Sequence, residues 1–131
     1  MIRIVKNQSN IIVLTLTERC TLTNPLFLFR FINDESKLSY TFIAQDNSLH
    51  NDRYNRFVIV EKTTPNRLLS EIELPLSGFY HYEIYEQTSP TNLNYTLATG
   101  IVEKGKVKVI GTSTTTTAYD SQNKFNIIYN G

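Results

Sequence analysis

The sequence predicts an all-β fold, an antiparallel sandwich of two sheets, on three observations. Apolar residues alternate with polar ones in about eight short segments, and clusters of Asn, Asp, Gly, Pro and Ser separate these segments. No window keeps the 3.6-residue apolar period of an amphipathic helix. Short strands with regular turns between them are typical of sandwiches, in which each strand buries one face and exposes the other.

The first three expected strands each place a stripe of apolar side chains on one face. They cover residues 11–18, 26–32 and 37–44. The stripes consist of Ile12, Leu14 and Leu16 in the first segment, Phe27, Phe29 and Phe31 in the second, and Leu38, Tyr40 and Phe42 in the third. Because successive side chains of a strand point to opposite faces, we expect each stripe to face the core.

The other expected strands are rich in Val, Ile, Thr, Tyr and Phe, which fit a half-buried pleated surface. They are residues 56–62, 68–74, 79–87, 95–110 and 124–130. Residues that favour turns gather at 24–25, 33–36, 45–52, 63–67, 74–78, 88–92 and 104–106. The regular alternation of strand and turn predicts a single domain, which is the usual organisation for a chain of 131 residues.

The composition changes after residue 111. Residues 1–111 are expected to form the sandwich, and residues 112–131 a Thr-rich linker followed by a C-terminal strand or arm. The last segment could fold back as an edge strand of its own domain, or it could extend and pair with a neighbouring subunit. In the second case its apolar side chains would make the inter-subunit contact, and these are Phe125, Ile127, Ile128 and Tyr129.

The stretch "LPLSGFYHY" at residues 74–82 has the pattern of a tyrosine corner, in which a tyrosine hydroxyl reaches back to the backbone a few residues upstream. Gly78 and Tyr80 take the corner positions, and Tyr82 stands where antibody domains carry their second cysteine. This pattern makes the expected fold an immunoglobulin-like antiparallel β-sandwich with an extended C-terminal arm. We interpret the aromatic run as part of the scaffold.

The sequence contains no motif for catalysis, for a metal or for a cofactor, so we expect none of these. The two histidines, His50 and His81, and the single cysteine, Cys20, lack the paired spacing of a metal site. A formal net charge of +1 argues against nucleic acid as a partner, because phosphate binding needs a basic excess. No segment is apolar over the length of a membrane span, and the first residues lack the pattern of a signal peptide.

Nearly the whole chain, from Ile11 to Gly131, resembles the small structural proteins of Bacteroidales phages, including the crAss-like group. The motifs that carry the resemblance are "GFYHYEIYEQTS" at residues 78–89 and "ATGIVEKGKVKV" at residues 98–109. These proteins have immunoglobulin-like sandwiches that are also similar to the N-terminal domain of certain baseplate upper proteins. The resemblance implies an auxiliary or decoration protein of the capsid, with the major capsid protein and other virion proteins as partners.

The same resemblance implies a location in the virion, after synthesis in the bacterial host cytoplasm, with self-association through the C-terminal strand as a further possibility. One alternative is a tail, baseplate or fibre-adaptor module on the same fold. A third function, of a different class, is a domain that binds host glycans. It would need exposed aromatic side chains, for which Tyr54, Phe79, Tyr85 and Tyr95 are the candidates.

Overall fold

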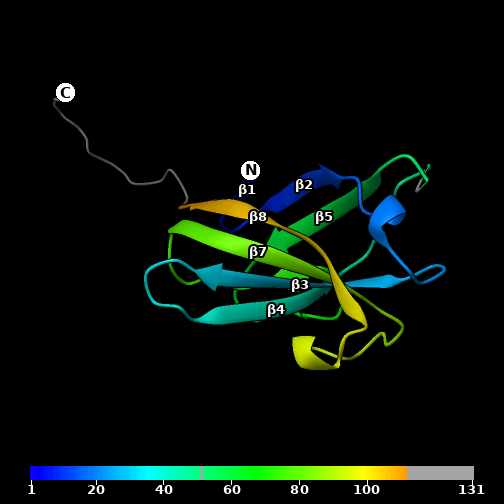
Figure 1. The fold of residues 1–131 in the computed structure, drawn as a ribbon. Helices are drawn as coiled ribbons and strands as arrows, with labels where there is room; N and C mark the ends of the chain where they lie inside the picture. The colour runs from blue at the N-terminus through cyan, green and yellow to red at the C-terminus, as the bar shows by residue number, and fades with distance from the viewer. Residues whose placement is uncertain (51, 112–131) are drawn as a thin grey trace, which may run out of the picture.

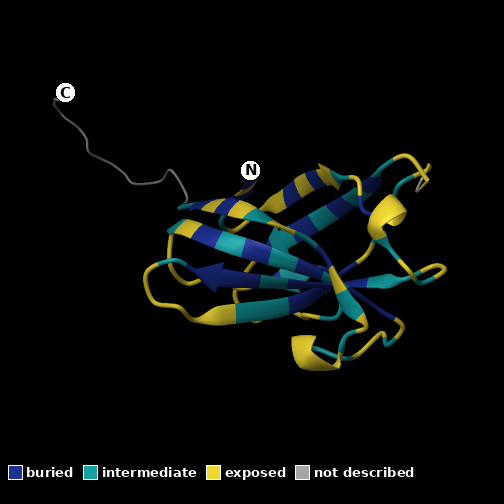
Figure 2. Cartoon of the chain, viewed as in Figure 1, coloured by how far each residue is buried: buried dark blue, intermediate teal, exposed yellow. Residues whose placement is uncertain are grey.

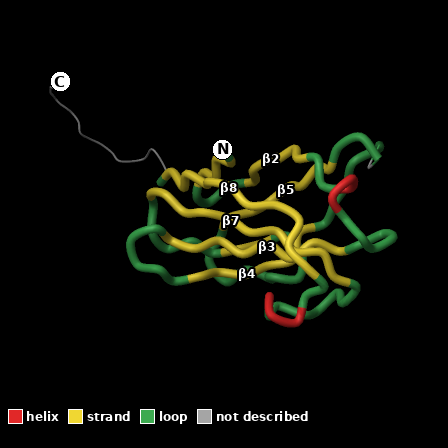
Figure 3. The backbone as a smooth tube through the Cα atoms, in the orientation of Figure 1, coloured by secondary structure: helices red, strands yellow, loops and turns green. Residues whose placement is uncertain are grey.

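A computed structural model describes residues 1–50 and 52–111, and over these residues the predicted all-β sandwich is confirmed. The strands are β1 (Ile2–Val5), β2 (Ser9–Leu14), β3 (Leu26–Asn33), β4 (Ser39–Ala44), β5 (Asn55–Glu61), β6 (Glu71–Ile72), β7 (Gly78–Gln87) and β8 (Gly100–Ile110). Two 3₁₀ turns, η1 (Thr17–Arg19) and η2 (Tyr95–Leu97), are the helical elements drawn in Figure 3. The expected strand at 124–130 lies outside the described residues.

The strands form two packed sheets (Figure 1). The larger sheet has five strands in the order β1-β8-β7-β3-β4, and the smaller has three in the order β2-β5-β6. The chain changes sheet between β1 and β2, between β2 and β3, between β4 and β5, and between β6 and β7. Its first and last described strands therefore meet at one edge of the larger sheet, where β1 pairs with β8.

Four details of the expected topology are wrong. The sheets are not purely antiparallel, because β1 pairs with β8 and β5 pairs with β6 in parallel. The strand β1 was not expected at all, and the strand expected at 68–74 is reduced to Glu71–Ile72. The strand expected from residue 95 begins at Gly100, because residues 95–97 form a 3₁₀ turn that the Asn94 side chain caps through the Thr96 amide.

The core is built mainly from the stripes that the alternation predicts, but Leu38 is 59% exposed and lies before the start of β4, so its expected place in the core is wrong. Figure 2 shows buried and partly exposed residues alternating along β7. Its centre is a group of packed phenylalanine rings, with Phe29 lying 5.1 Å from Phe57 and 5.2 Å from Phe42 between ring centroids. Such pairs add roughly 0.5–1.5 kcal/mol each beyond area burial. Phe29 and Phe31 are both fully buried on β3.

Strand β3 is buried on both faces, which explains why its sequence is a nearly continuous apolar run. Three buried side chains lie outside the main core cluster: Leu28 and Ile32 on β3, and Ile43 on β4. On β3 only Leu26 and Arg30 are partly exposed. The larger sheet therefore buries side chains on its outer face as well as on its core face.

Two buried carboxylates hold the loops against the sheets. Glu86, 3% exposed, accepts hydrogen bonds from the backbone amides of Thr21 and Leu22, each at 2.9 Å. Glu61 accepts from the amide of Asn7 at 2.9 Å, and from the amide of Leu74 at 2.8 Å. Buried polar groups are retained only when they are hydrogen-bonded, and these bonds satisfy both the carboxylates and the loop amides.

The narrower immunoglobulin-like assignment stays a prediction, and the strand order supports it. In immunoglobulin domains of the variable type, strands G, F, C and C′ are neighbours in one sheet. The run β8-β7-β3-β4 has the same chain-order pattern, with β2 and β5 paired in the opposite sheet.

Candidate interaction surface on the five-stranded sheet

The predicted corner residues lie where β7 begins. The Tyr80 hydroxyl donates to the carbonyl oxygen of Leu76 at 2.7 Å, which is the hydrogen bond that defines a tyrosine corner. Gly78 has a φ of 120°, a conformation that side-chain-bearing residues rarely adopt. Burial raises the pKa of the Tyr80 hydroxyl. Both residues therefore act in the scaffold, at the entry to β7.

Tyr82 is also a structural residue. Its side chain is buried, and its hydroxyl donates to Glu103 Oε2 at 2.6 Å. Burial is the largest cause that raises the pKa of Tyr82, and the hydrogen bond to Glu103 adds to it. The ring lies over Gly105, its cross-strand partner on β8.

The outer face of the five-stranded sheet carries a cluster of aromatic and charged side chains, which we call the Arg30 cluster: Arg30, Glu83, Tyr85 and Tyr95. Arg30 Nη1 lies 2.8 Å from Glu83 Oε1, and the Tyr85 hydroxyl donates to the same oxygen at 2.7 Å. The Arg30 guanidinium sits 4.0 Å from the centroid of the Tyr95 ring. The rings of Tyr85 and Tyr95 are 5.6 Å apart, so the four side chains form one ordered group.

The electrostatics of the Arg30 cluster fix its charges. Burial opposes ionisation of Glu83, but the hydrogen bonds from Tyr85 and Arg30 outweigh it and lower the pKa of that carboxyl. Burial and the bond to Glu83 raise the pKa of Tyr85 to about 12. At neutral pH the cluster therefore presents a carboxylate, a guanidinium and a neutral phenol in fixed positions. A group of this kind can stack on a flat partner and exchange hydrogen bonds with it.

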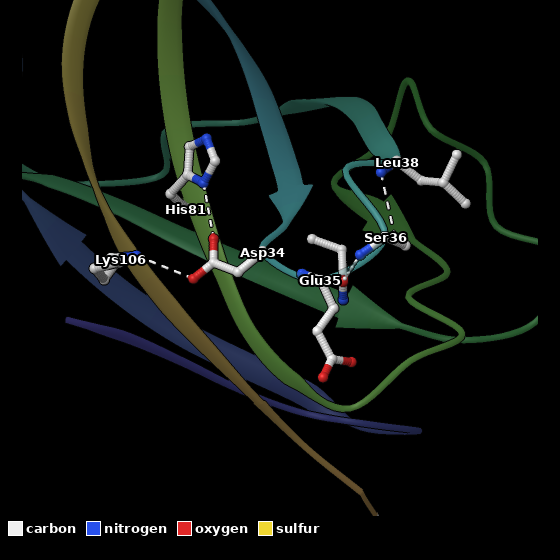
Figure 4. A network of polar contacts seen from close by, with 7 residues as sticks. Asp34, Glu35, Ser36, Leu38, His81 and Lys106 are labelled. Atoms are coloured by element: carbon white, nitrogen blue, oxygen red, sulfur yellow. Dashed lines mark hydrogen bonds and ion pairs between the residues drawn. The ribbon is translucent and has the colours of Figure 1, made fainter.

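A second polar group lies where β3 turns into the loop before β4 (Figure 4). Asp34 accepts from Lys106 Nζ at 3.0 Å, and its other oxygen lies 2.9 Å from His81 Nδ1. The hydrogen bonds from His81 and Lys106 lower the pKa of Asp34. A hollow of about 380 Å³ adjoins this group and is lined partly by Glu35, Ser77 and Phe79.

Within the described residues, the Asp34 group lacks the nucleophile that a catalytic triad needs. An Asp–His pair orients a base, and nucleophilic catalysis also needs a hydroxyl or thiol on the other ring nitrogen. Among residues 1–50 and 52–111, no hydroxyl is bonded to His81 Nε2. Cys20 lies elsewhere, with its thiol directed to the carbonyl oxygen of Leu16 at 3.3 Å, and burial raises the pKa of that thiol. The described part of the chain also brings no three His, Cys, Asp or Glu side chains together as metal ligands.

The aromatic residues proposed for glycan binding do not gather into one platform. Tyr85 and Tyr95 meet in the Arg30 cluster, where Tyr95 is 37% exposed. Phe79 is 51% exposed on the same strand as Tyr85 but six residues away, which is roughly 20 Å along a strand. Tyr54 lies in the loop before β5, which belongs to the other sheet. Of these four residues, Tyr85 and Tyr95 are the pair whose rings lie close enough to contact the same sugar ring.

The ion pair of Arg30 and Glu83 on this surface was missed at the level of sequence. Arg30 interrupts an apolar run, and its direct pairing with Glu83 across β3 and β7 could be recognised only once the register was known. The predicted contact residues Phe125, Ile127, Ile128 and Tyr129 lie outside the described residues. No helix in the described part of the chain has the length and apolar character needed to cross a membrane.

Comparison with known proteins adds little to this geometry. No model of a known family matches the chain, and no curated protein matches it. Among solved structures, the chain is similar to part of a candidate glycoside hydrolase from Bacteroides vulgatus ATCC 8482, at 10% identity and a TM-score of 0.46. The match covers 86% of this chain and 17% of that one.

Proposed function

We propose that this protein is a structural component of a phage particle, an auxiliary or decoration protein that docks on or between major capsid protein subunits. The observation that carries the proposal is the Arg30 cluster on the outer face of the five-stranded sheet. Its side chains are ordered by contacts with one another, so they lose little conformational freedom when a partner covers them. The sequence resemblance to phage structural proteins supplies the class of partner.

The chemistry of this face supports a protein partner. Tyrosine and arginine are the residue types most often found at the energetic centre of protein interfaces. Around the cluster lie exposed apolar side chains, Ile101 on β8 and Leu97 on η2. The chain has a net charge of +1, so it lacks the excess of basic residues that nucleic-acid-binding proteins use to contact phosphates.

The first test is the number of copies of this protein in purified particles, measured by quantitative mass spectrometry against the major capsid protein. A ratio near one, or a simple fraction of it, supports decoration of the whole shell. A few dozen copies or fewer would favour the tail, baseplate or fibre-adaptor alternative. Absence from purified particles would overturn the virion role altogether.

A second test asks whether the Arg30 cluster is the docking surface. We expect Tyr95→Ala to lower incorporation into particles roughly tenfold, because it removes a stacked, partly exposed ring at the centre of the surface. Leu69→Ala is the matched control, since Leu69 is 58% exposed and lies in the turn before β6. If both variants are incorporated like the parent protein, the docking surface lies elsewhere.

Glycan binding is retained as a second candidate because Tyr85 and Tyr95 stand together and could stack on a sugar ring. A glycan array probed with the purified protein tests this function directly. Binding that is lost in Tyr95→Ala would favour the glycan function over the capsid function. Failure to bind any glycan would leave the capsid proposal as the better one.

A further inference from the structure

The edges of the two sheets are protected to very different degrees. The edge of β4 is covered by residues 67–70, because the Ile43 amide donates to Arg67 O at 2.7 Å and the Ser70 amide donates to Ile43 O at 2.8 Å. On β1, both backbone groups of Val5 are bonded to the Asn10 side chain. The edge strand β6 is only two residues long. Covering, capping and shortening are common ways to prevent an edge from pairing with another chain.

Strand β2 lacks such protection in the described part of the chain. It forms the other edge of the three-stranded sheet, runs for six residues as "SNIIVL", and contains no charge and no proline. Its register with β5 is continuous from Ser9 to Leu14, so no bulge twists it away. By the criteria that apply to the other edges, β2 is the edge best suited to accept a strand.

The hydrogen-bond pattern shows which backbone groups of β2 face the open edge. The Glu61 amide donates to Gln8 O at 3.1 Å, so residues 8 and 61 are a hydrogen-bonded pair of the antiparallel ladder. Hydrogen-bonded pairs alternate with non-hydrogen-bonded pairs. Residues 10, 12 and 14 therefore bond β5, and Ser9, Ile11 and Val13 direct their amides and carbonyls outward.

The side chains at this edge are apolar and exposed. Ile11 and Val13 are 63% and 58% exposed. They border a groove of about 280 Å³ between β1 and β2, which Met1 and Arg3 line from the other side. An added strand would gain backbone hydrogen bonds from the edge and would also bury these side chains, as in the strand-addition mode of peptide recognition.

The sequence of residues 125–131, "FNIIYNG", matches this edge. It carries no charge and no proline, and it is close to β2 in length. If it is extended, Phe125, Ile127 and Tyr129 share one face. A neutral, apolar strand of this type pairs well with a neutral, apolar edge, and a charged strand would not.

The length of the spacer favours a second copy over the same chain. The described residues end at Gly111, which follows Ile110. The Ile110 carbonyl accepts from the Lys6 amide at 2.9 Å, and β2 begins three residues after Lys6, so Gly111 lies close to the start of β2. A connection of a few residues would therefore suffice to reach the chain's own β2. Residues 112–124, fully extended, span roughly 43 Å, which exceeds the width of a domain whose radius of gyration is about 13 Å.

We propose that β2 is the acceptor edge for residues 125–131 of a second copy of this chain, which adds a strand beside Ile11 and Val13. Reciprocal exchange between two copies would close a dimer, and exchange with successive copies would build an open row. This inference names the acceptor for the self-association through the C-terminal strand that the sequence analysis leaves open, and its place in a particle rests on the proposed function. Its test uses the purified protein alone, so its failure and the failure of the capsid role can be told apart.

The experiment measures the self-association of the full chain by sedimentation velocity and native mass spectrometry. The acceptor variant carries Ile11→Lys and Val13→Lys, because lysine blocks edge pairing while both side chains already face solvent. The matched control carries Leu38→Lys and Leu69→Lys, at two exposed sites away from β2 and from the Arg30 cluster. We expect the parent and the control to associate alike, and the acceptor variant to associate at least roughly tenfold more weakly.

A mixing experiment separates a second copy from the same chain. A donor variant with Phe125→Asp and Ile127→Asp keeps its β2 edge but loses its pairing strand. Neither the donor variant nor the acceptor variant should self-associate. Mixed together, they should form a complex of one copy each, because the intact strand of one meets the intact edge of the other.

Several results would overturn the proposal. Association that survives in the acceptor variant would place the contact elsewhere. The parent could be monomeric, with its Ile11 and Val13 amides protected from hydrogen exchange. If the donor variant loses that protection, residues 125–131 cover β2 of their own chain. A monomeric parent without that protection would show that β2 accepts no strand of this chain. If the acceptor variant does not fold, Ile11→Pro replaces it, since that amide does not bond β5.

Discussion

Gly105→Ala tests whether the close approach of β7 and β8 at Tyr82 determines local stability. The two residues are direct cross-strand partners. A Cβ atom added to Gly105 would lie 2.6 Å from Tyr82 Cε1 and 2.7 Å from both Cζ and the hydroxyl oxygen. The ring cannot move aside freely, because it is buried and its hydroxyl is bonded to Glu103 at 2.6 Å.

Two opposing effects set the magnitude. Overpacking of a well-packed site costs about 1–3 kcal/mol. Alanine in place of glycine recovers about 0.5–1 kcal/mol, because it restricts the unfolded chain. The φ of Gly105 is not in the left-handed region, so alanine adds no backbone strain. We expect Gly105→Ala to lower the free energy of unfolding by about 1–2 kcal/mol.

The assay is urea unfolding of four proteins in a double-mutant cycle: the parent, Gly105→Ala, Tyr82→Leu and the double variant. Leucine removes the atoms that the new methyl group would meet. In the Tyr82→Leu background, Gly105→Ala should therefore be neutral or should stabilise the protein by up to about 1 kcal/mol. An equal loss in both backgrounds, or no loss in the parent, would refute the steric argument.

Three further predictions concern buried or bonded polar groups. Glu86→Gln should lower the free energy of unfolding by about 1 kcal/mol and Glu86→Leu by about 3 kcal/mol. The difference arises because glutamine keeps an oxygen that accepts from the Thr21 amide, and leucine does not. Equal losses for the two variants in urea unfolding would contradict this role of Glu86. The difference between the ultraviolet pH titrations of the parent and Tyr85→Phe should show a phenol that ionises near pH 12, and in Glu83→Gln that midpoint should move toward 10. An unchanged midpoint would show that Glu83 is not responsible. The folded pKa of Asp34 is depressed, so its carboxylate should stabilise the fold above about pH 4 and lose this contribution as the pH falls below that value. The stability of Asp34→Asn should therefore depend less on pH below about pH 4 than the stability of the parent. Identical acid unfolding profiles of the two proteins would exclude this contribution.

The periodicity of apolar residues was enough to predict the two-sheet architecture and most of the strands. It worked for β3, β4, β5 and β7 because their stripes face the shared core. It failed for β1, whose four residues are too short a window to show alternation, and which is held as a strand by its pairing with β8. A parallel partner about a hundred residues away leaves no local signal in the sequence.

The polar parts of the surface were harder to predict, for a physical reason. On β7 the burial alternates as far as Glu86, which lies on the same side as Tyr82 and Ile84, but the charge of Glu86 gave no indication that it would be buried. Gln87 is buried out of phase with this alternation. The register of β7 and β8 shifts between Ile84 and Tyr85, because β8 carries one extra residue there. The partners of Glu86 come from the loop after η1, and that loop is positioned by tertiary packing rather than by local sequence.

The pairing of β1 with β8 also has a mechanical consequence. The two strands run in parallel, with Ile2 opposite Val107 and Val5 opposite Ile110. A force that pulls Met1 and Gly111 apart would therefore slide the strands along each other and strain all of their hydrogen bonds together, rather than opening them one at a time. Resistance to such a force depends on the unfolding rate under load and not on equilibrium stability. A domain tethered at these two points would behave as a clamp, and it would be weaker when pulled across the sheet instead.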